Sequence, residues 1–194
     1  SNARIFPVEV TVTNDAEGAP HATAPDDSDV RVSIAHTAGL GVAIAARGTD
    51  VGLDIERIED RPDSFELAAL SKKERARFEA LPDIDRQSVR DVELTRWWAA
   101  KEAAAKAAGT GMQGRPKDWK VVEIDGDRLR IGDRWFATTR LGSEHVVAWS
   151  EIDLPAARPG QTDRTEHHEQ DEHNEDHEDH EDHEDHEDHE DHEG

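Results

Sequence analysis

The segment WWAAKEAAAKAAGTG, Trp97–Gly111, predicts the central helix of the fold. It is rich in alanine, the best helix former. Gly109 follows the last apolar residue, as is typical of a helix end. We therefore expect a helix from Asp91 to Ala108, with Asp91 as its N-cap.

Three charges interrupt this apolar helix: Lys101, Glu102 and Lys106. Glu102 and Lys106 are four residues apart and share a face, whereas Lys101 lies about 100° round the helix. The simplest interpretation is a surface Glu–Lys pair, contributing about 0.2–0.5 kcal/mol. The alternative is functional, because the neighbouring tryptophans and alanines suggest packing on both flanks, where unpaired charges are costly.

A second charged pattern lies in VGLDIE, Val51–Glu56. Side chains alternate along a strand, so Asp54 and Glu56 share one face. They form either the solvated face of an edge strand or part of a ligand set. If Glu102 joins them, three hard oxygen ligands suit Mg²⁺, and Lys101 and Lys106 then suit phosphate oxygens.

His36 and Thr37 end the segment VSIAHT, Val32–Thr37. A lone histidine at a strand end is commonly a structural hydrogen-bonding group. With Thr37 beside it, His36 is alternatively a second phosphate contact.

The remaining pattern indicates an α+β domain with two main helices on antiparallel strands. A loop is expected over 14–29, and a turn at 39–41 joins two strands as a hairpin. The other expected elements are a helix at 67–80 and strands at 5–13, 30–36, 42–46, 51–56, 119–124, 128–131, 134–139 and 145–150.

Composition divides the chain into three parts: residues 1–3, which resemble an expression-tag scar, a domain at 4–155, and a Glu/Asp/His-rich tail at 156–194 expected to be disordered. The net charge of −23 belongs mainly to the tail, so the domain lacks the basic surface of a nucleic-acid binder. Cysteine is absent, which excludes thiolate chemistry. No apolar run suits a membrane span, and we expect a cytoplasmic protein.

Three segments in this order resemble the 4′-phosphopantetheinyl transferase superfamily: SIAHT at 33–37, VGLDIE at 51–56, and the W-x-x-K-E-x-x-x-K pattern that begins at Trp98. Their order is like that of the C-terminal half of the surfactin-synthetase-activating type. The resemblance covers about residues 18–150 and leaves out the tail.

The resemblance implies transfer of the 4′-phosphopantetheine arm of coenzyme A to a serine of an acyl or peptidyl carrier protein, with release of 3′,5′-ADP. Asp54, Glu56 and Glu102 would bind Mg²⁺, and Glu102 would also be the base. Lys106, assisted by Lys101, would contact the phosphate beside the broken bond. His36 and Thr37 would hold coenzyme A phosphates.

Two departures qualify the resemblance. Ala35 stands where relatives often carry a hydroxyl residue, and Gly18-Ala19-Pro20 resembles a Gly-Lys-Pro turn without its lysine. We also expect the N-terminal half, which completes the pocket in the surfactin type, to be absent or reduced in this sequence. Either upstream sequence supplies it, as in a transferase fused to a polyketide synthase, or copies of the chain associate.

Two rival functions remain open. An inactive, transferase-like module that binds carrier proteins would explain the motifs and the departures together. A metal-buffering protein would use the tail, whose imidazoles recur every three residues and suit Ni²⁺, Zn²⁺ or Cu²⁺.

Overall fold

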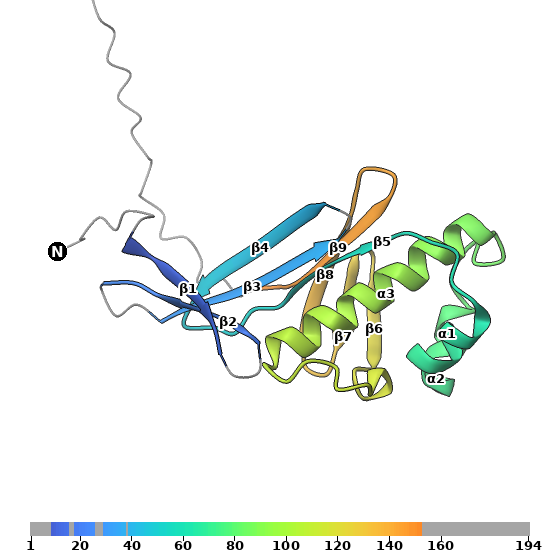
Figure 1. Ribbon diagram of the computed structural model, residues 1–194. Helices are drawn as coiled ribbons and strands as arrows, with labels where there is room; N and C mark the ends of the chain where they lie inside the picture. The colour runs from blue at the N-terminus through green and yellow to red at the C-terminus, as the bar shows by residue number, and fades with distance from the viewer. Residues whose placement is uncertain (1–8, 16–17, 26–28, 38, 153–194) are drawn as a thin grey trace, which may run out of the picture. The chain divides into compact units, whose positions relative to one another are not determined.

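The computed structural model describes residues 9–15, 18–25, 29–37 and 39–152 (Figure 1). The chain divides into two units, Ser1–Pro155 and Ala156–Gly194. The predictions for residues 1–3 and for the tail lie outside the described residues. Among the helices described, none combines the length and apolar character needed to span a membrane.

The strands of the described residues form two antiparallel sheets. The first has the order β1-β2-β3-β4 and the second the order β5-β9-β8-β7-β6. The strands are β1 (Thr11–Asn14), β2 (Pro20–Thr23), β3 (Val30–Thr37), β4 (Leu40–Arg47), β5 (Leu53–Arg57), β6 (Val121–Asp125), β7 (Arg128–Ile131), β8 (Arg134–Leu141) and β9 (His145–Ser150).

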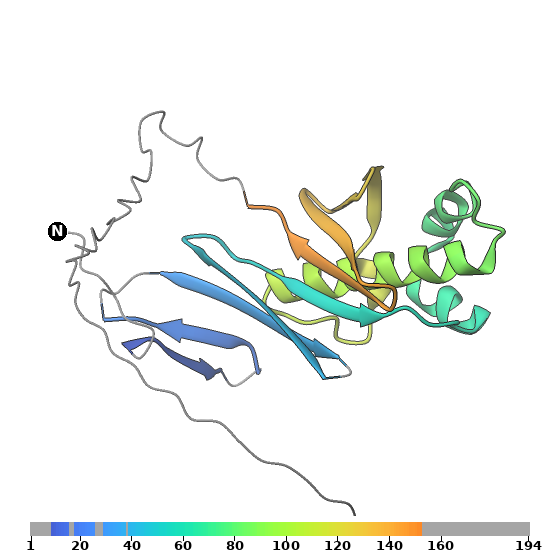
Figure 2. The same cartoon turned by 90° about the horizontal axis from the view of Figure 1, so that it is seen from above.

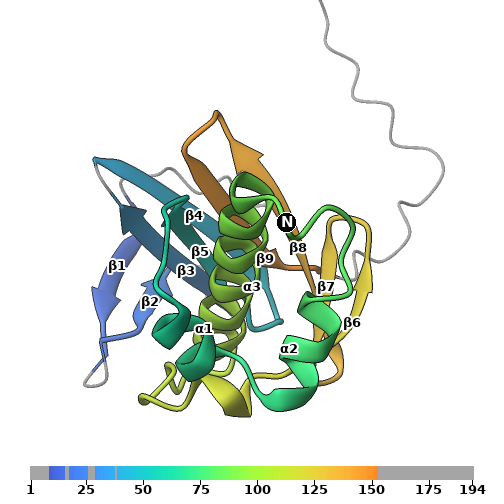
Figure 3. The same ribbon diagram turned by 90° about the vertical axis from the view of Figure 1, so that its right-hand side faces the viewer.

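The long helix α3 (Gln87–Ala107) packs on the five-stranded sheet, mainly against β5 and β9. Two short helices, α1 (Asp63–Ala69) and α2 (Lys72–Phe78), connect β5 to α3, and a 3₁₀ turn, Pro116–Asp118, precedes β6. Figure 3 shows α3 lying across the strands with α1 and α2 beside it.

The predicted α+β class is confirmed, but three α-helices replace the two expected in the described residues. The helix predicted at 67–80 is divided because Ser71 is an N-cap: it forms a capping box with Glu74 and starts α2. The long helix begins at Gln87, so Asp91 is not its N-cap; its carboxylate accepts a hydrogen bond from the Gln87 side chain at 2.7 Å.

The N-terminal strands also differ from the prediction. The loop expected at 14–29 contains β2, which pairs with β1 and leads into β3. The hairpin predicted around residues 39–41 is confirmed as β3 and β4, with His36 opposite Gly41.

The core lies between α3, the short helices and the five-stranded sheet. Trp97 and Phe78 are both fully buried and meet edge to face, with ring centroids 5.5 Å apart. The alanines of α3 face the sheet, and their small size allows the helix to lie close to the strands.

Gly52 marks the closest approach between the strand segment and the helix. A Cβ atom at this position would lie 1.9 Å from the Ala103 carbonyl oxygen and 2.7 Å from the Ala107 nitrogen. Only glycine therefore allows the segment leading into β5 to lie against α3 in this way. The contact places the β5 carboxylates directly beneath the charged face of the helix.

The two sheets meet at β5. The Leu53 amide donates a hydrogen bond to the Ser33 hydroxyl on β3 at 3.0 Å, and both residues are buried. Figure 2 shows β5 running between β3 and β9. Residues of the four-stranded sheet are thereby brought to the strand that carries Asp54.

Candidate active site

Two carboxylates of β5 face α3, as the alternation predicts. Asp54 Oδ1 pairs with Lys106 Nζ at 2.8 Å, and Glu56 Oε1 accepts a hydrogen bond from Trp98 Nε1 at 3.2 Å. Lys106 and Trp98 both belong to α3. β5 is the edge strand of the five-stranded sheet, but the alternative that this face is solvated is wrong, because α3 covers it and Asp54 is buried.

We call Asp54, Glu56 and Glu102 the acid cluster. Burial raises the pKa of Asp54, and the nearby Lys106 charge opposes this rise. Burial also raises the pKa values of Glu56 and Glu102, and in both cases the charge of Asp54 adds to the effect. The three groups therefore influence one another, and crowded, partly buried anions favour a cation between them.

Two residues of the acid cluster, Asp54 and Glu102, have carboxylate oxygens that no described residue binds. Asp54 Oδ2 is buried without a hydrogen-bond partner, and Glu102 makes no hydrogen bond or ion pair within the described residues. An unpartnered buried carboxylate oxygen is costly unless something binds it. This donor set suits a hard dication such as Mg²⁺. Over the described ranges, however, no three acidic or histidine side chains form a ready-made metal cage.

Two adjoining pockets open beside Lys106, with volumes of about 250 and 290 Å³. Both contain Ala19, Pro20, Val32, Lys106 and Gly109. The first also contains Ser33 and Thr110, and the second His21 and Arg31. The pockets thus join the end of α3 to β2 and β3, and the Gly18-Ala19-Pro20 turn noted in the sequence lies in the first of them.

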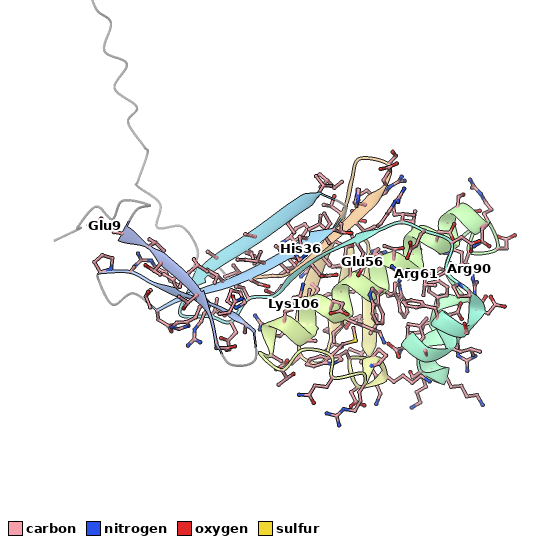
Figure 4. The ribbon with its side chains drawn as sticks, in the orientation of Figure 1. Glu9, His36, Glu56, Arg61, Arg90 and Lys106 are labelled. Atoms are coloured by element: carbon pink, nitrogen blue, oxygen red, sulfur yellow. The ribbon has the colours of Figure 1, made fainter. Side chains whose placement is uncertain are left out.

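His36 and Thr37 do not line either of these pockets. His36 is exposed on β3, and Figure 4 labels it together with Glu56 and Lys106. Ser33, earlier in the same strand, lies at the pocket instead. Neither of these two pockets therefore joins His36 or Thr37 to Lys106, and a coenzyme A contact by His36 or Thr37 stays a prediction.

The expectation that Lys101 assists at the phosphate is contradicted. Its side chain is completely buried and pairs with Glu74 of α2 at 2.7 Å. The amine also donates hydrogen bonds to the carbonyls of Ala69, at 2.9 Å, and Pro116, at 3.1 Å. Lys101 turns toward the short helices because its rotation about α3 directs it away from Asp54 and Lys106. It joins structural elements and has no donor to spare.

Sequence reasoning missed two neighbours of the acid cluster. Arg61 Nη2 pairs with Glu56 Oε2 at 2.8 Å, and the Trp98 indole donates to the other oxygen. Trp98 belongs to the recognised motif, which could have drawn attention to it. Nothing local in the sequence distinguishes Arg61 from other surface arginines.

The model of the 4′-phosphopantetheinyl transferase superfamily matches residues 50–153. Comparison with curated proteins finds no match. Among solved structures, the chain is similar to a holo-[acyl-carrier-protein] synthase of Thermotoga maritima, with 23% identity and a TM-score of 0.42. The alignment covers 53% of this chain and 61% of that synthase, which is less than two thirds of its length. The family match includes β5, α3 and the acid cluster, and it covers more than half of the sequence: the chain belongs to the 4′-phosphopantetheinyl transferase superfamily.

Proposed function

We propose that this protein transfers the 4′-phosphopantetheine arm of coenzyme A to the serine hydroxyl of an acyl or peptidyl carrier protein and releases 3′,5′-ADP. Family membership supports the reaction class. The observation that carries the proposal is that Lys106 lines a pocket and at the same time pairs with Asp54. Glu102, which has no hydrogen-bond partner among the described residues, lies close enough for the charges of Asp54 and Lys106 to act on it. This arrangement provides both signs of charge where a metal-bound pyrophosphate needs them.

Lys106 is the residue that we assign to the phosphate. Its side chain is 31% exposed, so it reaches both the pocket and Asp54. Lysine is a compact cation on a flexible stem, and its amine is suited to move between a carboxylate and a phosphate oxygen. In this role it stabilises the charge on the phosphate beside the breaking bond.

Glu102 is the residue that we assign to the proton. Its carboxylate makes no hydrogen bond or ion pair within the described residues, so one of its oxygens is available to accept a proton. The serine oxygen forms the new bond to phosphorus while the bond to the 3′,5′-ADP oxygen breaks. The serine proton passes to a Glu102 oxygen, and the nucleotide leaves as an anion.

Asp54 and Glu102 would hold Mg²⁺, with Glu56 as the third carboxylate of the cluster. Mg²⁺ bound there would neutralise pyrophosphate charge and would lower the cost of expelling the nucleotide. Asp54 also accepts a hydrogen bond from Lys106, and this bond holds the lysine side chain beside the pocket. No covalent enzyme intermediate is needed.

The test is release of 3′,5′-ADP from coenzyme A, Mg²⁺ and an apo carrier protein, followed by chromatography. Glu102→Gln should abolish release while the thermal transition stays unchanged, because the amide keeps the shape but loses charge and basicity. Glu123→Gln is the matched control: it makes the same change at an exposed position on β6 and should retain full activity. Full activity of Glu102→Gln would show that Glu102 is neither the proton acceptor nor a required metal ligand. Absence of release by the unaltered protein across a set of carriers would favour the inactive binding module.

A further inference from the structure

Glu56 differs from the other two acids of the cluster because both of its oxygens are already engaged. Oε2 pairs with Arg61 at 2.8 Å, and Oε1 accepts the Trp98 hydrogen bond at 3.2 Å. Asp54 keeps a buried oxygen without a partner, and Glu102 makes no hydrogen bond or ion pair with the described residues. Three carboxylates of similar charge are therefore unequal as metal ligands.

Arg61 is held in place by packing as well as by charge. Its guanidinium lies 4.5 Å from the centroid of the Phe65 ring, and Phe65 packs edge to face on Trp98 at 4.9 Å. The two hydrogen-bond donors to Glu56 thus belong to one connected stack of side chains. Figure 4 shows Arg61 next to Glu56 and apart from Lys106.

This packing separates Arg61 from Lys106 in function. The Arg61 side chain is only 11% exposed, against 31% for Lys106, and its guanidinium is engaged by Glu56 and the Phe65 ring, so it is poorly placed for a phosphate. Its other ion pair, at 3.4 Å, is with Glu59, which is 55% exposed and contributes little. The main electrostatic partner of Arg61 is therefore Glu56.

We propose that Arg61 sets the cation affinity of the acid cluster. Its guanidinium competes with the dication for the Glu56 carboxylate, so that Asp54 and Glu102 are the two acids that bind the dication directly. Arg61 is a positioning residue that acts through Glu56. This inference rests on the proposed metal-dependent transfer. Its consequence is a metal site weaker than three free carboxylates would make, and one that needs substrate phosphate oxygens to complete it.

Terbium luminescence of the full chain provides the test. Tb³⁺ is a hard cation that takes oxygen ligands, and tryptophan close to the ion excites its emission. Trp98 touches the acid cluster, whereas residues 156–194 contain no aromatic side chain apart from histidine, so tail-bound Tb³⁺ is not excited locally. Asp54→Asn identifies the signal from the site, and displacement by Mg²⁺ gives the relative affinity for Mg²⁺.

Arg61→Gln should increase Mg²⁺ affinity by about tenfold, because an opposite charge in contact with a carboxylate changes its affinity for a cation by about this factor or more. Arg57→Gln is the matched control: it removes the same charge from an exposed position at the end of β5, on the face opposite Glu56. It should change the affinity by less than about twofold, since surface charges are screened. Arg61→Lys keeps the positive charge, and its Mg²⁺ affinity should stay close to that of the unaltered protein.

A double-mutant cycle shows whether Arg61 acts through Glu56. In a Glu56→Gln background, Arg61→Gln should have no more effect than Arg57→Gln. The inference is overturned if Arg61→Gln matches Arg57→Gln in the unaltered background, if it weakens binding, if its effect persists without Glu56, or if the site binds no Tb³⁺. These results are independent of 3′,5′-ADP release: a chain that shows the Arg61 effect but releases no nucleotide refutes only the proposed function.

Discussion

Lys101→Met removes one charge of a fully buried ion pair while keeping the length of the side chain. The Lys101 and Glu74 side chains are 0% and 1% exposed, and their charged atoms lie 2.7 Å apart. The same amine also binds the carbonyls of Ala69 and Pro116. Methionine would leave all three acceptors without this donor.

The structure sets the size of the effect. Removing one partner of a buried pair typically costs about 3–5 kcal/mol. Glu74 keeps two other donors, the Ser71 amide at 2.8 Å and the Val121 amide at 3.0 Å, which favours the lower end of that range. We expect a loss of about 3 kcal/mol in the free energy of unfolding. For a domain of about 150 residues, this corresponds to roughly 6–12 °C in Tm.

Urea unfolding measures the loss, and Lys72→Met is the control because it makes the same change at an exposed position of α2. The control should stay within about 0.5 kcal/mol of the unaltered protein. Lys101→Met/Glu74→Gln should recover part of the loss, because no buried carboxylate is then left unpaired. Below its transition, Lys101→Met should keep its KM for coenzyme A. An unchanged free energy of unfolding for Lys101→Met, together with a raised KM for coenzyme A, would contradict the structural role and support a phosphate contact by Lys101.

Three further predictions concern other parts of the chain. Gly52→Ala should lower stability by several kcal/mol or prevent folding, because its Cβ would overlap the Ala103 carbonyl, and a Tm within 2 °C of the unaltered protein would count against the close contact. Light scattering should detect self-association of the chain and its loss in Ile34→Lys, because Ile34 is 47% exposed on the four-stranded sheet; a monomer before substitution would contradict this. Truncation of residues 156–194 should leave transfer unchanged and remove Ni²⁺ binding measured by calorimetry, whereas loss of transfer with an intact fold would show that the tail takes part.

Local patterns predict the two charged faces that form the acid cluster, whereas their meeting was implied only by the family resemblance. Alternation in 51–56 places Asp54 and Glu56 on one face, and helical spacing places Glu102 and Lys106 on another, and the structure brings these two faces together. The division between α1 and α2 was also readable, because Ser71 followed three residues later by Glu74 is a capping-box pattern.

Other features depend on tertiary contacts that no local pattern encodes. Helical spacing places Lys101 and Glu102 on different faces of the helix, but it does not predict that Glu74 packs against the face that carries Lys101. The contact between Arg61 and Glu56 depends on how the chain turns after β5 and stacks Phe65 on Trp98. Similarly, Ser33 reaches the pocket region because β3 lies against β5, a pairing of faces fixed only in the folded domain.

The most direct test of the central claim is the intact mass of an apo carrier protein after incubation with this protein, coenzyme A and Mg²⁺. The claim predicts that the carrier gains the mass of one phosphopantetheine arm, located on its serine. It also predicts that Asp54→Asn needs more Mg²⁺ to reach the same conversion, because a neutral amide is a poorer ligand for a hard dication. A carrier of unchanged mass with the folded, unaltered protein, over a set of acyl and peptidyl carriers, would contradict the assignment of this site to arm transfer.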